Sequence, residues 1–257
     1  MQSDALKRAV MQPEAVTSPL DAKFLEAIIM TETRITPRTN RINDADVCVK
    51  PDHIIKPGDK KMSEWVAAVN QPPFFTCPAD AACRESCYAG KGFYNMFADT
   101  VLRSAWRNLY FFNTDPDGFF ALLNSELDEA DRLRPWKYFR WHETGDIVNA
   151  RYFEGMVDVA RRHKNTIFMA FTKKYEIVNA WIDENGSLPK NLVIIFSIWG
   201  KYGLGVNRHN LPCAYVQGVG GDEYIAKSAR ECNGGCKDCD FQCWKLRKRQ
   251  SVVFHKH

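Results

Sequence analysis

The sequence lacks a long hydrophobic run, a large excess of charge of either sign, an internal repeat and any low-complexity tract. Its longest apolar run, residues 192–199, is far shorter than the roughly 20 residues that cross a bilayer, so no membrane partner is expected. The amino-terminal residues contain no apolar core of the length that a signal peptide needs, which predicts a cytoplasmic protein. A formal net charge of +4 is too weak to indicate a nucleic-acid partner on its own.

Histidine is also absent from the two cysteine-rich stretches of the chain, which together hold seven of its nine cysteines. The first cysteine set is Cys77-x5-Cys83-x3-Cys87, and the C-terminal cysteine set is Cys232-x3-Cys236-x2-Cys239-x3-Cys243. Thiols stay reduced in the cytosol, so clustered cysteines there are more typical of metal sites than of disulfides. Soft thiolate ligands favour zinc or the iron of an iron–sulfur cluster.

The spacing of the C-terminal set favours an iron–sulfur cluster over zinc, because zinc sites usually consist of two separated pairs of ligands. Zinc, or thiols without a metal, are the alternatives. The first set supplies three ligands, and a cubane cluster held by three thiolates leaves one iron open to a substrate or cofactor. Alternatively, Cys48 or Cys213 closes this site as a fourth ligand, or the two sets share one site.

Apolar runs alternate with amphipathic stretches along most of the chain. Helices are expected at residues 21–29, 60–70, 93–113, 119–134, 150–165, 173–186 and 221–232. Strands are expected at residues 72–78, 135–141, 166–172, 188–200 and 212–218. This rhythm predicts an α/β protein with a parallel sheet, arranged as a partial or closed (β/α) barrel. The expected division is an N-terminal extension (1–70) packing on the barrel, the barrel (71–220) and a cysteine-rich C-terminal segment (221–257).

Polar side chains follow several of the expected strands, where parallel barrels place their chemistry. The candidate catalytic residues are His142, Glu143, Asp146 and Lys173. The candidate cofactor-binding residues are Glu143, Asp146, Ser197 and Gln217. For a lone histidine such as His142, a structural hydrogen-bonding role is the alternative.

One dense basic run, "KLRKRQ" at residues 245–250, follows the last cysteine. It is interpreted as a solvated helix end, with a phosphate contact as the alternative.

Four stretches together resemble the phage gene-product-eighty-eight family: "TCPADAACRESCYAGKGFYN", "YFRWHETGDIVNARYFEGMVDVARRH", "IFMAFTKKYEIVNAW" and "CKDCDFQCW". The resemblance covers about residues 75–245 and implies a radical-SAM-like (β/α) barrel with iron–sulfur chemistry, in the host cytoplasm if phage-encoded. It adds S-adenosylmethionine as a candidate cofactor. The spacing departs from the C-x3-C-x2-C of radical S-adenosylmethionine enzymes at residues 77–87. That spacing occurs instead at 232–239, after the barrel, with Cys243 available as a fourth ligand.

Three functions follow from these patterns. The first is a redox enzyme for a small-molecule substrate, with an open-iron 4Fe-4S cluster at the first set and an electron-relaying cluster at the C-terminal set. The second is a non-catalytic iron–sulfur carrier or redox sensor that serves an electron-transfer partner. The third is a zinc-stabilised nucleic-acid-binding protein.

Overall fold

A single mixed sheet organises the chain in the computed structural model, which describes residues 47–84, 87–90, 98–218 and 221–255. The strands are β1 (Lys56–Pro57), β2 (Val66–Val69), β3 (Tyr138–Trp141), β4 (Ile167–Thr172), β5 (Leu192–Ser197), β6 (Cys213–Gln217), β7 (Arg230–Glu231) and β8 (Ser251–His255). The α-helices are α5 (Ala98–Thr114), α6 (Pro116–Leu133), α7 (Ala150–Arg162) and α8 (Tyr175–Asn185). Three short 3₁₀ helices are η5 (Tyr88–Gly90), η6 (Asp222–Tyr224) and η7 (Gln242–Lys245).

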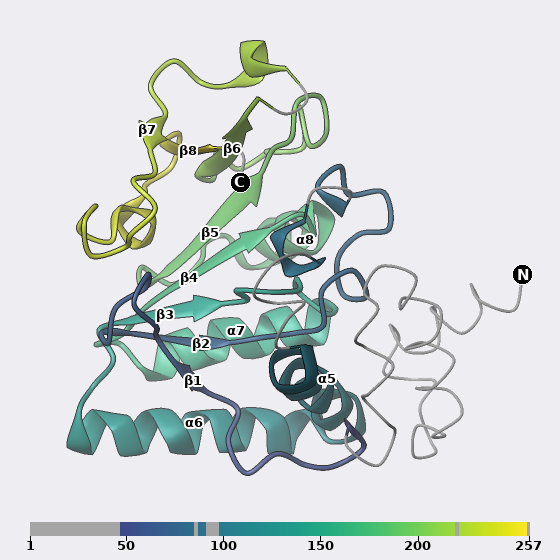
Figure 1. Cartoon of the computed structure of the whole chain (residues 1–257), viewed down its shortest axis with the longest axis vertical. Helices are drawn as coiled ribbons and strands as arrows, with labels where there is room; N and C mark the ends of the chain where they lie inside the picture. Colours follow the sequence, from purple (N-terminus) through teal and green to yellow (C-terminus); the bar gives the residue numbers. More distant parts are fainter. Residues whose placement is uncertain (1–46, 85–86, 91–97, 219–220, 256–257) are drawn as a thin grey trace, which may run out of the picture.

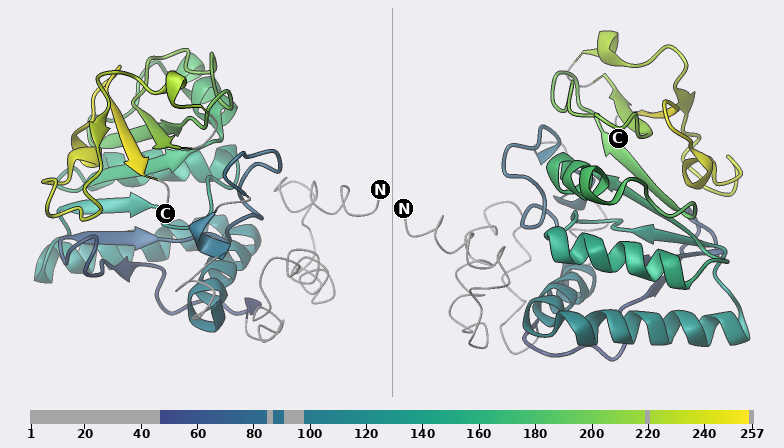
Figure 2. Two further views of the ribbon diagram at one scale, coloured as in Figure 1. Left: turned by 45° about the horizontal axis from the view of Figure 1, so that its top comes forward. Right: turned by 180° about the vertical axis from the view of Figure 1, so that it is seen from behind.

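The eight strands lie in the order β1-β2-β3-β4-β5-β6-β8-β7 (Figure 1). All neighbouring pairs are parallel except β1 and β2, which are antiparallel. Helices connect β2 to β3, β3 to β4 and β4 to β5, and α6, α7 and α8 lie side by side over one face of the sheet (Figure 2). The predicted α/β class with a parallel sheet is therefore confirmed. Within the described ranges the edge strands β1 and β7 do not pair, so these residues form an open sheet and not a closed barrel.

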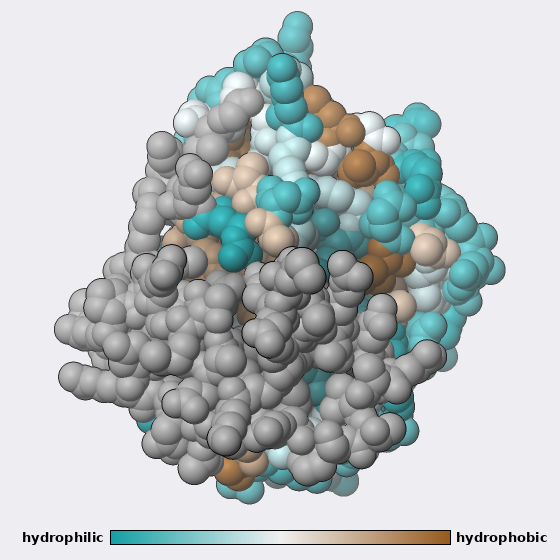
Figure 3. All heavy atoms as spheres, turned by 90° about the vertical axis from the view of Figure 1, so that its right-hand side faces the viewer, coloured by the Kyte–Doolittle hydropathy of each residue, from teal (hydrophilic) through white to brown (hydrophobic). Residues whose placement is uncertain are grey.

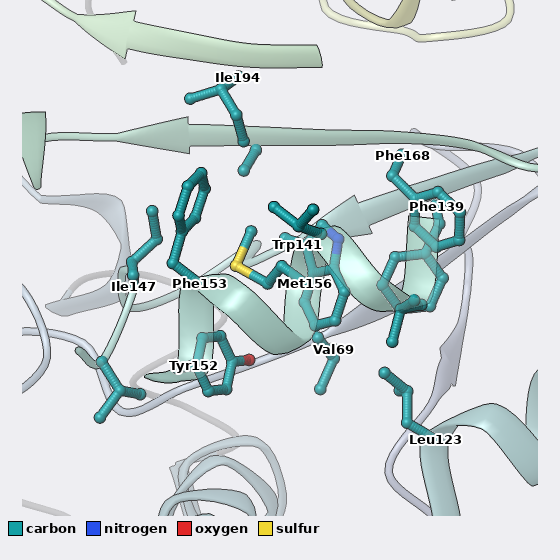
Figure 4. Close-up of a cluster of buried hydrophobic side chains, with 14 of the residues drawn as sticks. Val69, Leu123, Phe139, Trp141, Ile147, Tyr152, Phe153, Met156, Phe168 and Ile194 are labelled. Atoms are coloured by element: carbon teal, nitrogen blue, oxygen red, sulfur yellow. The ribbon is translucent and has the colours of Figure 1, made fainter. Parts of the chain in front are cut away.

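The core divides between the two faces of the sheet because successive strand residues point to opposite faces. The helix-covered face is filled by large apolar side chains, which include Val69, Phe139, Trp141, Phe168 and Ile194 from the strands and Tyr152, Phe153 and Met156 from α7 (Figure 4). Helix α7 has the predicted amphipathic pattern, with its buried residues on the side that meets these strands.

The chain's C-terminal segment packs against the opposite face. The ring of Phe241 stacks on Tyr138 with centroids 4.4 Å apart, and the indole Nε1–H of Trp244 donates to the Phe139 carbonyl at 2.9 Å. Strand β2 comes from the expected N-terminal extension, and β7 and β8 come from the expected C-terminal segment. All three belong to the same sheet as the strands between them, so the sheet extends across the expected segment boundaries at 70/71 and 220/221.

Helix starts follow local capping chemistry. Asp115 caps α6 by accepting the Gly118 N–H at 2.8 Å, with Pro116 at the first helical position. Asn149 caps α7 by accepting the Tyr152 N–H at 2.9 Å. No helix in the described ranges is long and apolar enough to cross a membrane.

Three element predictions were wrong. Residues 60–70 contain β2 instead of a helix, because their apolar residues pair between β1 and β3. Residues 72–78 form turns instead of a strand, because the two consecutive prolines there have no backbone N–H to donate to a neighbouring strand. Residues 221–232 contain only η6 and β7. The helix expected at 21–29 lies outside the described residues.

Candidate functional site

The loop that follows β3 brings the predicted polar residues together at the carboxyl edge of the sheet. His142, Glu143, Thr144 and Asp146 are all buried there. The backbone turns sharply at Gly145, where φ is +81°, and a Cβ at this position would lie 2.5 Å from the Gln71 carbonyl oxygen. Only glycine allows this close approach, which locks the loop onto the segment after β2. Side chains on the described surface of this side of the molecule are hydrophilic with small apolar patches (Figure 3).

Glu143 is held in a buried polar network. Its carboxylate accepts from Lys56 Nζ at 2.9 and 3.1 Å and from Asn70 Nδ2 at 2.8 Å. The Asn70 side chain completes the network, because its oxygen accepts the Glu143 N–H at 2.8 Å. The Tyr88 hydroxyl donates to the Glu143 carbonyl. These contacts fix the loop backbone and leave the carboxylate beside one cation.

Asp146 ties the β3 loop to the end of β4. Its carboxylate accepts from the Thr172 hydroxyl at 2.6 Å, from the Lys173 N–H at 2.9 Å and from the Ile147 N–H at 2.8 Å. Burial raises the pKa of this carboxyl group, while the Lys173 charge and the three hydrogen bonds oppose the increase. The carboxylate thus positions Lys173, a second predicted site residue.

His142 lies behind this loop, against α7. Its Nε2 is 3.2 Å from the Tyr152 hydroxyl, and this hydroxyl accepts a hydrogen bond from Gln71 Nε2 at 3.3 Å. Burial, with a smaller effect from the Arg140 charge, lowers the pKa of His142 to about 3. The imidazole is therefore neutral, and Tyr152 can donate its proton to Nε2. Within the described part of the chain, the buried Nδ1 has no hydrogen-bond partner.

The first cysteine set lies beside Asp146 and Lys173. The charges of both residues act on the Cys77 thiol, as does Cys87, and burial raises the pKa of Cys77 to about 12. Cys83 interacts electrostatically with Tyr175 and Tyr202. The sequence-predicted polar loop and the first cysteine set are thus neighbours at the carboxyl ends of β3 and β4.

Three further predicted site residues, Lys173, Ser197 and Gln217, lie at the ends of strands β4, β5 and β6 and differ in burial and contacts. Lys173 Nζ lies over the Trp199 ring, 5.7 Å from its centroid. Ser197 is buried, and its carbonyl accepts from the Tyr175 hydroxyl. Gln217 is exposed at the end of β6, level with His255 of β8. Gln217 is the predicted residue for which the structure gives no contact with this group.

The C-terminal cysteine set lies on the face of the sheet opposite α6, α7 and α8, where Cys243 belongs to η7. The Cys236 N–H donates to the carbonyl of Lys61, which precedes β2, at 2.8 Å. Burial raises the pKa of Cys236 to about 11 and that of Cys243 to about 12. The other thiols of the set raise both pKa values further, and the Arg140 guanidinium opposes them. The four thiols are therefore close enough to interact with one another.

These thiols match the donor chemistry of zinc and iron–sulfur sites. Among the described residues, however, no three His, Cys, Asp or Glu side chains converge as ligands of one ion. Metal binding at either set therefore requires the side chains to close on the metal from the positions seen here. Asp146 and Lys173 act on Cys77 of the first set, whereas Arg140 of β3 acts on Cys236 and Cys243 of the C-terminal set. One site shared by the two sets stays a prediction.

Cys213 and Cys48 are placed differently from both sets. Cys213 is half-buried against the helix-side core, where Asn207 Nδ2 is 3.3 Å from its sulfur and its thiol is 3.7 Å from the Leu211 carbonyl. Cys48 packs against the same core. Cys213 acts electrostatically on Tyr175, as Cys83 of the first set does. A fourth ligand from Cys48 or Cys213 stays a prediction.

Sequence reasoning missed the residues that support the loop, namely Lys56, Asn70, Gln71 and Tyr152. Asn70 and Gln71 directly follow β2, so recognising β2 as a strand would have placed them at the carboxyl edge. Lys56 and Tyr152 carry no comparable local signal.

The family model for Gene product 88 matches residues 41–240, most of the described chain. The chain belongs to the Gene product 88 family. This confirms the family resemblance drawn from the motifs. The Gene product 88 match spans the first cysteine set, the polar loop and all of the C-terminal set except Cys243. No curated protein and no solved structure matches the chain significantly.

Proposed function

We propose that this Gene product 88 protein is an iron–sulfur protein with a cluster at each cysteine set. The main support is the C-terminal set, where four thiols lie within twelve residues and Cys243 interacts electrostatically with the other three and with Arg140. Buried neighbouring thiols ionise reluctantly, and a bound metal removes this cost by holding them as thiolates. The segment around them has only two strand residues and one short 3₁₀ helix, so a metal would also supply much of its stability.

We further propose that the first cysteine set holds the cluster that takes part in chemistry. Cys77, Cys83 and Cys87 would hold it, and it would supply one-electron transfer to a small-molecule substrate or an electron-transfer partner. The set lies at the carboxyl edge of parallel strands, the usual location of catalytic groups in such folds. The neighbouring Lys173 cation and Asp146 carboxylate would orient a polar ligand there, while Glu143 and neutral His142 hold the loop in place.

The finer proposal is a radical-SAM-like enzyme on a partial (β/α) barrel. Parallel strands joined in chain order by helices on one face support it. Incubation of the reduced protein with S-adenosylmethionine should then yield 5′-deoxyadenosine. An unchanged cluster spectrum without this product would leave an iron–sulfur carrier or sensor as the function.

Metal analysis tests the iron–sulfur proposal directly. Protein purified without oxygen should contain about eight irons with matching sulfide, as expected for two cubane clusters. C77S/C83S and C236S/C243S should each lose about half of the iron. C213S tests whether Cys213 is a fourth ligand: full iron content supports a cluster held by three thiolates, and loss of iron identifies Cys213 as a ligand of the first set. Zinc alone, without visible absorbance, would contradict the redox function and favour a structural zinc site.

A further inference from the structure

The amino edge of the sheet carries an uneven distribution of charge. The segments that lead into β3, β4, β5 and β8 are residues 132–137, 163–166, 187–191 and 245–250. Together they contain nine lysines and arginines and no aspartate or glutamate. All nine basic side chains are exposed. The whole chain has a net charge of only +4, so these four segments are far more basic than the chain as a whole. The segment before β2, residues 58–65, carries two lysines and two carboxylates, and its Glu64 interacts with Arg134.

These segments lie along one edge because the strands that they precede are parallel. Backbone hydrogen bonds join them to the neighbouring strands: Lys137 O accepts from Ile167, Asn191 O from Phe168, and Gln250 O from Cys213. From β3 to β8 the edge crosses four strand spacings, about 19 Å at about 4.8 Å each. The amino ends of β3, β4 and β5 lie on the left in Figure 1.

Nearby carboxylates neutralise only part of this charge. Asp240 pairs with Lys245 and also interacts with Lys137. Arg247, Lys248 and Arg249 have no carboxylate at ion-pair distance among the described residues. They project from a tight turn in which the Gln250 side chain accepts the Arg247 N–H at 2.8 Å. Three adjacent cations are thus presented to solvent from a fixed backbone.

An exposed aromatic ring lies at the same edge. Trp65 directly precedes β2, and its side chain is among the few large apolar groups that remain exposed, at 42%. Its carbonyl accepts the Tyr138 N–H at 3.1 Å, which fixes it beside the segment before β3. The Arg134 guanidinium lies over the ring, 5.6 Å from the centroid. An exposed indole beside cations is suited to stacking with an unpaired base.

We propose that the amino edge of the sheet binds single-stranded nucleic acid, with the basic segments contacting phosphates and Trp65 stacking on a base. Phosphate contacts explain the spread of cations over four segments, and the aromatic ring favours a single strand over a duplex, whose bases are already stacked. The proposal does not depend on either metal cluster, because none of these residues belongs to a cysteine set.

Fluorescence anisotropy with a labelled 20-nucleotide oligo-dT tests this surface. R247Q/K248Q should weaken binding at least about tenfold at low salt and reduce the slope of log K against log salt by about 1.4, from two lost phosphate contacts. The matched control K50Q/K201Q removes the same charge from two exposed residues towards the carboxyl edge, because Lys50 precedes the antiparallel β1 and Lys201 follows β5, and it should change affinity less than about twofold. W65A should weaken binding about fivefold or more with little change of slope, as expected for a lost stacking contact.

Three results would overturn the proposal. The first is no binding of the oligonucleotide at low salt, and the second is an equal loss of affinity in the control variant. The third is equal affinity for a duplex of the same length, which would show that the surface does not select single strands. Iron and zinc contents should be the same in all variants, so failure of this proposal is distinguishable from failure of the iron–sulfur proposal.

Discussion

Protonation of His142 should make the protein's stability depend on pH between about 3 and 6.5. The side chain is 3% exposed, and its pKa is about 3 in the folded protein against an ordinary value of 6.5. Below pH 6.5 the unfolded chain binds a proton at this position and the folded chain does not. The contribution of neutral His142 to stability is therefore fully present above pH 6.5 and decreases as the pH falls towards 3.

The magnitude follows from proton linkage. Between pH 8 and pH 5, protonation of this one imidazole lowers the free energy of the unfolded state by about RT ln(1 + 10^1.5), or about 2 kcal/mol. The folded state gains almost nothing, since pH 5 is still well above the folded pKa. The free energy of unfolding should thus decrease by about 2 kcal/mol from this residue alone.

Urea unfolding of the wild type and of H142Q at pH 8, 7, 6 and 5 measures this effect. Glutamine cannot titrate but can still form a hydrogen bond with the Tyr152 hydroxyl. Any stability that H142Q loses equally at every pH cancels when only the pH dependence of the two proteins is compared. The difference between the two proteins should shrink by about 2 kcal/mol as the pH falls to 5. A difference that stays constant within about 0.5 kcal/mol would show that His142 is not buried as a neutral imidazole.

Two further substitutions test how the loop and the C-terminal segment are held. G145A places a methyl group 2.5 Å from the Gln71 carbonyl oxygen at a positive φ, and it should lower the free energy of unfolding, measured by urea titration, by about 3 kcal/mol. The control G186A has a similar φ but nothing within 4 Å of the added methyl group, so it should lower the free energy of unfolding by only about 1 kcal/mol. W244F removes the indole donor from the buried Phe139 carbonyl and should cost about 1–2 kcal/mol, whereas W65F at an exposed site should change stability by less than about 0.5 kcal/mol.

The helices and the central strands could be predicted because their patterns are strong over many residues. Strands β4 and β5 are continuous apolar runs, and α7 is amphipathic over its whole length. Strand β2 has only four residues, and its sequence "VAAV" suits a helix as well as a strand. Its pairing with β3, which is 69 or more residues away, decides the outcome, and no local pattern encodes that contact.

The site was predictable to a similar extent. The "HETGD" loop followed from its place after a strand, whereas its supporting contacts come from distant segments, as with Lys56 and Glu143. The helix expected at 221–232 failed for a related reason. This stretch is held by contacts such as the Cys232 N–H donating to the Val253 carbonyl at 2.9 Å, and these depend on β8.

The two cysteine sets occupy structural settings that suit different roles. The C-terminal set lies in a segment whose rings pack against Tyr138 and whose backbone joins Lys61 and Val253, so a metal there would fasten this segment across the sheet. Its binding energy would add to folding, as in other small metal-bound segments. The first set adjoins a loop that Asp146 and Glu143 already fix by hydrogen bonds. A metal is less needed there for stability, so the preformed edge is the better place for a cluster that reacts.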